Sequence, residues 1–229
     1  MKSYNYVDGL PTLSSLETKE INGKRHYLLP SGKYVPSVTT MLGYFKAHRI
    51  QEWRNRVGHE QANKISNRAS TRGTKFHNLL QKYLENSPLT SILTENVMPD
   101  MKQAFYDMES TLDKIDNIHY LETPLYSEKM RLAGRTDVIG EFDGVLSVID
   151  FKTSSKPKTE SMIEDYFLQG TCYALMYEER VGIPIDQIVV IMSTDGMEKP
   201  QLFVKSKEEY EEKLCDKILK FYLDNRTLL

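Results

Sequence analysis

The chain has 229 residues, of which 40% are hydrophobic and 27% charged, as expected for one folded domain with a hydrophobic core. Its net charge of -2 and isoelectric point near 6.2 exclude a generally basic surface, so a nucleic acid would have to be held by a local basic patch. The two cysteines, Cys172 and Cys215, are too few for an iron–sulfur cluster and lack the CxxC spacing of a zinc site.

The N-terminal segment MKSYNYVDGLPTLSSLETKE has no apolar stretch typical of a secretory signal, and its early acidic residues are unlike those of a transit peptide. No apolar run reaches the ~18 residues that a transmembrane helix needs. We therefore expect a soluble protein of a reducing compartment, with no membrane partner.

The N-terminal region, residues 1–36, predicts a small β-hairpin or meander. Its turns are Asn22-Gly23 and Pro30-Ser31-Gly32, which lie between short runs of alternating residues. These two turns separate the region from the helical patterns that follow.

Helical patterns dominate the next region, residues 37–118. The segment 37–86 has three glycines as candidate breaks, Gly43, Gly58 and Gly73, and residues 87–98 are expected to form a loop. From Pro99 an apolar stripe with helical spacing predicts a further helix that has proline in its first turn. The stripe consists of Met101, Phe105, Met108, Leu112 and Ile115.

The last region, residues 119–229, predicts strands separated by helices. The strand patterns cover 119–126, 130–142, 145–153, 187–193 and 200–205, and the helices cover about 159–180 and the chain from about 206. Helices on both sides of a mixed central β-sheet define an α/β or α+β fold, in a single domain that spans residues 1–229.

A tight hairpin in this region brings two aspartates together. Between the runs RLAGRTDVIGEF and VLSVIDFKT lies only Asp143-Gly144, a dipeptide that favours a two-residue type I′ turn. Such a turn places Phe142 opposite Val145 and, further along both strands, Asp137 opposite Asp150. Opposed residues have Cβ atoms about 5 Å apart, so the two carboxylates would be neighbours.

Opposed carboxylates in a partly buried site destabilise a sheet unless a cation neutralises them. Mg²⁺ or Mn²⁺ binds carboxylate oxygens and leaves positions for water and phosphate, so one or two such ions are the expected cofactor. Lys152 shares a strand face with Asp150, and its ammonium can orient an attacking water and stabilise charge developing on phosphorus. The alternative is a surface ion pair between Asp150 and Lys152, which the apolar context VIDF disfavours.

Six segments occur in a specific order along the chain: PSVTTML (36–42), EWRNRVG (52–58), RGTKFH (72–77), ETPLYSEKMRLAGRTD (122–137), VIDFKTSSKPK (148–158) and QGTCY (169–173). In this order and spacing they resemble the PD-(D/E)xK nuclease superfamily, and within it the RecB-like exonuclease branch. The resemblance implies a restriction-endonuclease-like core with an N-terminal helical arch that hydrolyses phosphodiester bonds.

The resemblance also implies which residues hold the metal. His77 would be a ligand together with Asp137 and Asp150, and the backbone carbonyl of Phe151 would be a further ligand. Glu122 matches an acid of the family that binds a second ion or supports the first. From the residue pattern alone, a lone histidine such as His77 on an apolar helical face is more often a core residue.

Further roles follow from the same resemblance. Gln169 would orient Lys152 or a phosphate, and Tyr173, one turn later on the same helix, would help to hold the assembly. Packing of Tyr173 under the sheet is the alternative. Thr153 and Ser154 could donate hydrogen bonds to phosphate or could simply end a strand.

The segment 44–76 carries eight basic residues against two acidic ones, a local charge of +6. A solvated basic helix is the common explanation of such a run, but interleaved Tyr44, Phe45 and Trp53 offer faces on which single-stranded bases can stack. The resemblance implies helices that arch over the site and admit a free single-stranded end. The residues expected to contact DNA here are Arg49, Trp53, Arg54, Arg56, Arg68, Arg72 and Lys75.

The sequence thus predicts a Mg²⁺- or Mn²⁺-dependent exodeoxyribonuclease that acts as a monomer on single-stranded DNA in the cytoplasm of a bacterium or phage-infected cell. An endonuclease on the same core and a DNA-binding accessory protein without catalysis remain alternatives. Because Asp137, Asp150 and Lys152 are all present, the accessory role is disfavoured. The iron–sulfur branch of the family is disfavoured because four cysteines are required there.

Overall fold

A five-stranded mixed sheet forms the centre of the protein in a computed structural model, which describes residues 2–225. The strands lie in chain order across the sheet, and only β6 and β7 are parallel. The helix α6 (Glu164–Val181) provides the crossover between these two parallel strands. The strands are β4 (Ile115–Ser127), β5 (Leu132–Phe142), β6 (Val145–Ser154), β7 (Gln187–Thr194) and β8 (Gln201–Ser206).

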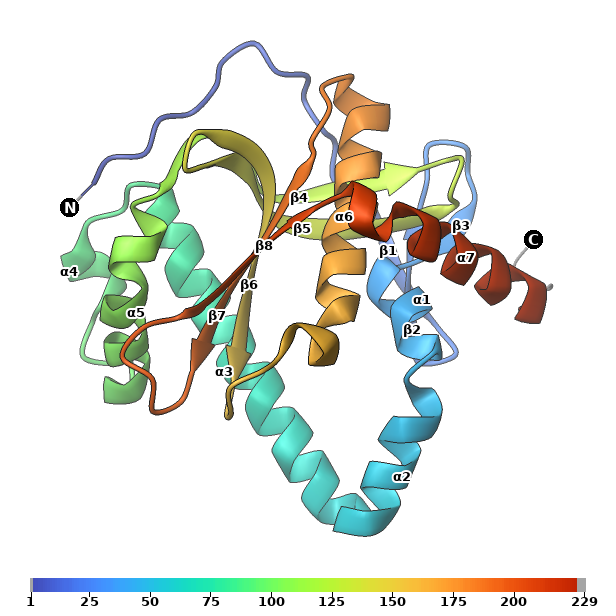
Figure 1. The fold of residues 1–229 in the computed structure, drawn as a ribbon, viewed down its shortest axis with the longest axis horizontal. Coiled ribbons are helices and arrows are strands. Elements are labelled where there is room, and N and C mark those ends of the chain that lie inside the picture. The colour runs from blue at the N-terminus through green and yellow to red at the C-terminus, as the bar shows by residue number, and fades with distance from the viewer. Residues whose placement is uncertain (1, 226–229) are drawn as a thin grey trace.

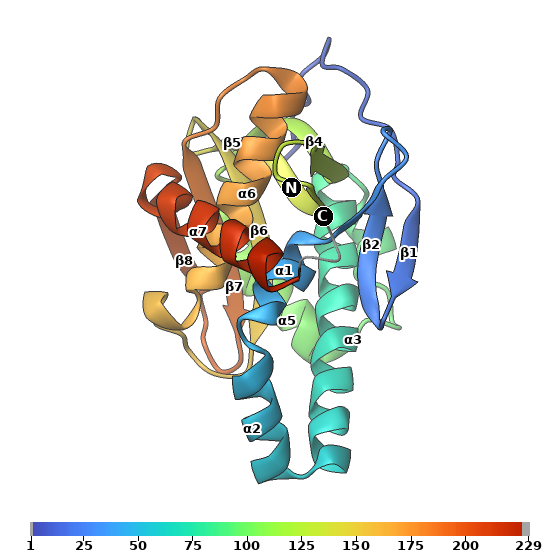
Figure 2. The same cartoon turned by 90° about the vertical axis from the view of Figure 1, so that its right-hand side faces the viewer.

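Helices cover both faces of this sheet (Figures 1 and 2). On one face lie the C-terminal part of α3 (His59–Leu84) and α5 (Pro99–Leu112). On the other face lie α6 and α7 (Glu208–Asp224). The 3₁₀ turn Glu160–Met162 directly precedes α6. The α/β class predicted from the sequence is therefore confirmed.

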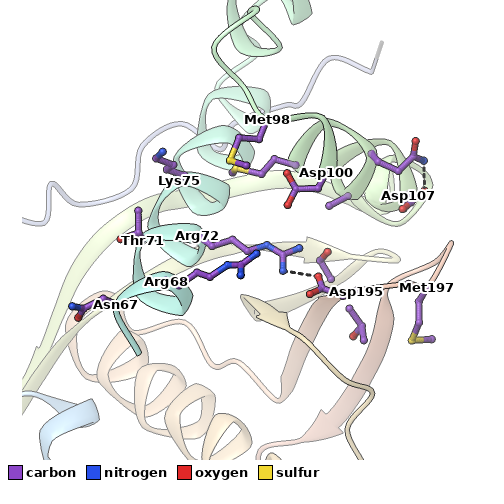
Figure 3. Close-up of a pocket in the computed structure, with 16 residues that line it drawn as sticks. Asn67, Arg68, Thr71, Arg72, Lys75, Met98, Asp100, Asp107, Asp195 and Met197 are labelled. Carbon is purple, nitrogen blue, oxygen red and sulfur yellow. Dashed lines mark hydrogen bonds and ion pairs between the residues drawn. The ribbon is translucent and has the colours of Figure 1, made fainter. Parts of the chain in front are cut away.

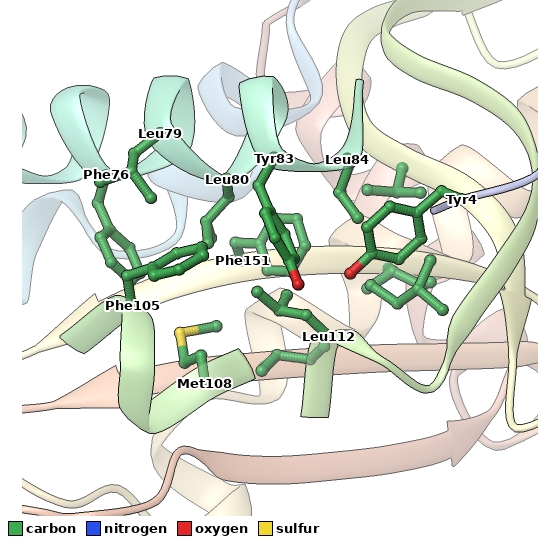
Figure 4. Packing of buried hydrophobic residues seen from close by; sticks show 14 of the residues in the cluster. Tyr4, Phe76, Leu79, Leu80, Tyr83, Leu84, Phe105, Met108, Leu112 and Phe151 are labelled. Carbon is green, nitrogen blue, oxygen red and sulfur yellow. The ribbon is translucent and has the colours of Figure 1, made fainter. Parts of the chain in front are cut away.

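The core under α3 shows why only part of that helix is anchored (Figure 4). Its buried apolar residues follow the helical spacing of one face but begin only at Phe76 and continue to Leu84, apart from Ala62 near the start. They pack on α5, where the rings of Tyr83 and Phe105 meet edge to face with their centres 4.9 Å apart. The other buried residues of this stripe are Leu79 and Leu80.

The remaining part of α3 joins α2 (Ala47–Val57) in a helical arm that projects away from the sheet (Figures 1 and 2). Gly58, with φ of 89°, forms the tight connection between the two helices. None of the residues of α2 is buried. This arm corresponds to the predicted arch, and α1 (Val38–Tyr44) connects it to the core through Met41 and Leu42.

A three-stranded antiparallel sheet lies beside the main sheet and consists of β1 (Thr18–Ile21), β2 (Lys24–Leu28) and β3 (Tyr34–Pro36). Asn22 and Gly23 have positive φ, as the type I′ turn requires. Immediately after β3, Ser37 caps α1 by accepting a hydrogen bond of 2.9 Å from the backbone of Thr40. The meander predicted for the N-terminal region is therefore observed.

Several predicted element boundaries differ from the structure. Gly43 and Gly73 lie inside helices, because packing on the sheet and on neighbouring helices sustains them through a glycine. The predicted loop 87–98 contains the short helix α4 (Leu89–Ile92). Ile115 begins β4 and does not extend the α5 stripe, so the strand region starts before residue 119. Within residues 2–225, every helix is too short or too polar to cross a bilayer.

The contact between α6 and the sheet depends on Gly170 and gives a test of the fold. Gly170→Ala is expected to destabilise the protein by about 1–3 kcal/mol, because the added Cβ would overlap with Cγ2 of buried Ile188. The matched control is Gly43→Ala, another helical glycine with open space at its Cβ position, which should be neutral or stabilising by up to about 1 kcal/mol. Urea unfolding measures both, and equal stabilities of the two variants would contradict this packing.

Candidate active site

The β5–β6 hairpin has the register that the sequence predicts. Asp143 and Gly144 both have positive φ, and Phe142 pairs with Val145. Regular pairing continues to Val138 and Ile149, one position before the two aspartates. Beyond this pair, Oδ2 of Asp137 accepts a hydrogen bond of 2.8 Å from the backbone N–H of Phe151. A side-chain hydrogen bond therefore joins the two strands where their backbone pairing stops.

Three side chains from three elements form a group that can hold a metal ion. His77 from α3, Glu122 from β4 and Asp137 from β5 each offer a ligand atom, and these atoms lie within 4.8 Å of one another. The Nδ1 atom of His77 is 3.4 Å from Oδ1 of Asp137. Glu122 therefore lies beside His77 and Asp137, whereas Asp150, the other carboxylate predicted as a ligand, is not part of this group.

Glu122 reaches this position through an unusual backbone conformation. Its φ is 44° in the middle of β4, although its neighbours Leu121 and Thr123 both pair with β5. Nε of Arg135 donates a hydrogen bond of 2.7 Å to the carbonyl oxygen of Glu122 and lies 3.2 Å from its Oε2. A left-handed non-glycine residue costs about 1–3 kcal/mol and persists where neighbours fix it, as Arg135 does here.

Sequence reasoning missed Arg135, although a signal was present. Arg135 belongs to the GRTD motif and alternates onto the same face of β5 as Asp137. Its contact with Glu122 could not be predicted, because the left-handed backbone at Glu122 is not marked in the sequence by a glycine or an asparagine.

Asp150 and Lys152 face each other in a buried ion pair. Oδ2 of Asp150 has no hydrogen bond of normal geometry within the described residues, and the Nζ atom of Lys152 lies against it. Lys152 also lies over the ring of Tyr166, with Nζ 4.9 Å from the ring centre. Tyr166 too was missed, although its place three residues before Gln169 puts both on one face of α6.

The charges of this cluster are incompletely compensated. Burial raises the pKa of Asp150 to about 6 against the opposing charge of Lys152, and the nearby Asp137 adds to the rise. Burial and Asp137 also raise the pKa of Glu122. Burial disfavours the charged form of Asp137 as well, but the hydrogen bond and charge of His77 hold its pKa below the ordinary value. A divalent cation would relieve this excess of negative charge, so the donor set fits Mg²⁺ or Mn²⁺.

Gln169 and Tyr173 form the buried floor of the site. Nε2 of Gln169 donates a hydrogen bond of 3.3 Å to the hydroxyl of Tyr173, and no hydrogen bond from Gln169 to Lys152 is found within residues 2–225. The ring of Tyr173 packs on the backbone of Gly134, where a Cβ atom would lie 2.6 Å from its Cε1 and hydroxyl oxygen. Tyr173 therefore packs on the sheet, and this contact explains the glycine of GRTD.

The residues predicted to contact DNA are distributed along the arm. Arg49, Trp53, Arg54 and Arg56 lie on α2, and Arg68, Arg72 and Lys75 lie on α3. Nη2 of Arg54 donates to Oδ1 of Asn63 at 2.5 Å, which ties the two helices together.

Some aromatic and hydroxyl residues have structural contacts instead of free faces. Tyr44 and Phe45 were expected to offer stacking faces, but Tyr44 packs edge to face on Phe221 of α7 and Phe45 packs on Tyr44. The Ser154 hydroxyl donates to the carbonyl of Lys156, as expected at a strand end. Thr153 lies close to α3, with its Oγ1 3.9 Å from the position that a Cβ on Gly73 would take, which is an ordinary contact.

Comparison with known proteins agrees with this arrangement. A model of the PD-(D/E)XK nuclease superfamily matches residues 45–224, so the chain belongs to this superfamily. Its members are nucleases that use divalent metal ions and act on DNA.

Particular relatives are similar over a shorter range. The chain is 26% identical over 133 residues to mitochondrial genome maintenance exonuclease 1 of Homo sapiens and 28% identical over 134 residues to the Mus musculus protein of the same name. In both cases the match covers 54% of this chain and 38% of the relative. The chain therefore matches well under half the length of these curated relatives.

The raised pKa of Asp150 predicts a pH dependence of metal binding. Below about pH 6 a proton competes with the cation for Asp150, so the Mn²⁺ affinity of the protein should fall by up to about tenfold per pH unit as the pH decreases. Above this pH Asp150 is ionised, and the remaining dependence should come from His77, whose pKa burial lowers but the hydrogen bond and charge of Asp137 hold above the ordinary value. Calorimetric titration between about pH 5 and 8 measures the effect, and Asp150→Asn should remove the part of it that lies below about pH 6. An affinity that is constant across this range would contradict a role of Asp150 in metal binding.

Proposed function

We propose that the protein is a Mg²⁺- or Mn²⁺-dependent deoxyribonuclease that removes nucleotides from free ends of single-stranded DNA, as a monomer, in the cytoplasm of a bacterium or phage-infected cell. The observation that carries this proposal is the joint position of the His77–Glu122–Asp137 group and the buried Asp150–Lys152 pair at the base of a basic helical arm. The names of the curated relatives, which are exonucleases, support the exonuclease assignment.

A metal ion would be held by His77, Glu122 and Asp137. Asp150 would offer a further carboxylate, and the backbone carbonyl of Phe151 is the additional ligand that the resemblance implies. When bound, the ion supplies Lewis-acid polarisation of the scissile phosphate and activation of the attacking water. The protein would contribute the position of the ligands, and Arg135 holds Glu122, the ligand whose backbone is left-handed.

The charge state of Lys152 limits its role. Burial lowers the pKa of this lysine, but Asp150 and Asp137 raise it by more, so its pKa lies above the ordinary value. Lys152 therefore stays protonated at neutral pH. In this state it can donate hydrogen bonds to water or to a phosphate oxygen and stabilise developing negative charge, but it cannot take a proton from water.

The arm supports a preference for single strands with an end. Its two helices carry the predicted phosphate-binding arginines and a half-buried Trp53 for base stacking. In this proposal a strand enters between the arm and the core and reaches the metal group at His77, where α3 joins the core. A closed circle has no end to insert.

The first experiment compares linear and circular single-stranded DNA of equal sequence, labelled at either end, with Mg²⁺, Mn²⁺ or EDTA. We expect metal-dependent degradation of the linear strand only, and a loss of at least about 10²-fold in rate for Lys152→Ala because a transition-state charge contact is removed. Cleavage of the circle would favour the endonuclease alternative. A wild-type protein that binds DNA but leaves every substrate intact with metal would favour the accessory alternative.

The second experiment removes two exposed arginines of the arm, Arg49→Ala and Arg56→Ala together. We expect a higher KM with little change in kcat, and a weaker salt dependence by a log–log slope of about 0.7 for each lost contact to a single-stranded phosphate. The control is Lys24→Ala with Lys33→Ala, which removes two exposed charges from the N-terminal sheet region. Equal effects of the two double variants would show that the arm contributes only general charge.

A further inference from the structure

A cavity whose lining contains none of the residues of the metal group lies beside α3 (Figure 3). Its volume is about 620 Å³, within the about 300–1,000 Å³ typical of sites for small molecules. Residues of α3, the N-terminal half of α5 and the loop between β7 and β8 form its walls. None of the roles described above for the metal group accounts for this cavity.

Two guanidinium groups lie side by side in this cavity, and one of them is paired with a carboxylate. Arg68 and Arg72 extend side by side from α3 toward Asp195 (Figure 3). Arg72 forms an ion pair of 2.5 Å with Asp195, whereas no ion pair or hydrogen bond of Arg68 is found within residues 2–225. Two adjacent arginines with a single acidic partner favour a further anion, and a guanidinium fork matches the oxygens of a phosphate.

The rest of the cavity suits a nucleobase. Met98, Met101 and Met197 line it with flexible, polarisable side chains that pack well on aromatic rings. Asp100, in the first turn of α5, points into the same space (Figure 3). Its carboxylate accepts hydrogen bonds only, so it would favour bases with an exocyclic amino group and disfavour thymine.

The cavity adjoins the strand that carries the catalytic pair. Ser193 and Thr194 of its lining pair in parallel register with Thr153 and Ser154, the residues that follow Lys152 in β6. The N–H of Asp195 donates to the carbonyl oxygen of Ser154 at 3.0 Å. The anion-binding end is therefore fixed to the end of β6, a few residues from Asp150 and Lys152.

We infer that this cavity is a nucleotide subsite, in which one nucleotide next to the scissile bond places its phosphate on Arg68 and Arg72 and its base against the methionines. The inference rests on the proposed function, because it assigns the subsite to the DNA strand being cut. Asp100 and Asp107 face the same cavity and disfavour ligands with several phosphates, so the occupant carries a single phosphate.

The test is calorimetric titration of the whole protein with deoxycytidine 5′-monophosphate in EDTA, so that metal-mediated phosphate binding does not contribute. We expect binding that Arg68→Ala weakens about tenfold or more, the effect of one charge-assisted contact. The control is Lys64→Ala, one turn earlier on α3, where Lys64 pairs with Glu60 outside the cavity. Two comparison ligands should bind more weakly than deoxycytidine 5′-monophosphate. The first is the nucleoside deoxycytidine, which has no phosphate, and the second is thymidine 5′-monophosphate, whose base has no exocyclic amino group.

Two outcomes overturn the inference: no binding of the nucleotide by the wild-type protein at millimolar concentration, or equal affinities of the Arg68→Ala and Lys64→Ala variants. Melting temperatures of both variants exclude unfolding as the cause of a loss. The two proposals fail separately. A wild-type protein that degrades linear DNA but does not bind the nucleotide contradicts only the subsite. One that binds the nucleotide through Arg68 but cuts no DNA contradicts the nuclease assignment, and with it the place of this nucleotide next to a scissile bond, while nucleotide binding by the cavity stands.

Discussion

Three carboxylates, of Glu122, Asp137 and Asp150, lie close together where the pairing of β5 and β6 stops, and their shared burial is the constraint on which the surrounding structure depends. Burial disfavours the charged form of Asp150 and raises its pKa to about 6 against the opposing charge of Lys152, and the nearby Asp137 adds to the rise. Lys152 and His77 compensate part of the charge. The remaining negative charge would favour the binding of a divalent cation between these side chains.

Holding like charges together requires rigid neighbours, and small residues make this possible. Gly134 allows Tyr173 to lie flat on the backbone of β5, and Gly170 allows α6 to approach Ile188. Both contacts press α6 against the face of the sheet that carries Asp150. On the opposite face of the sheet, Phe151 packs edge to face on His77, which links α3 to the strand that carries Asp150 and Lys152.

The helix α3 has two parts that differ in burial. His77 follows Phe76, the residue at which continuous anchoring to the core begins, so this candidate metal ligand lies on the anchored part. The N-terminal half, with α2, has few apolar contacts and many exposed basic residues. Such a segment can adapt to a strand of nucleic acid without disturbing the metal group, because local stability follows local packing.

The sequence by itself determined the elements and the central hairpin. The Asp143-Gly144 turn fixes the register of β5 and β6, since a two-residue loop leaves no freedom in pairing, and strand alternation then places Asp137, Asp150 and Lys152 together. The apolar stripe from Phe76 to Leu84 likewise fixes which face of α3 is buried, and therefore where His77 points.

Only the tertiary structure decided the contacts between elements distant in sequence. The left-handed backbone of Glu122 and its clamp by Arg135, the ion pair of Arg72 with Asp195 and the packing of Tyr44 on Phe221 all join separate elements. Local propensity cannot specify them, because each depends on the distance and angle at which whole helices and strands pack. The same holds for the cavity beside α3, whose three walls are formed by segments that no periodicity relates to one another.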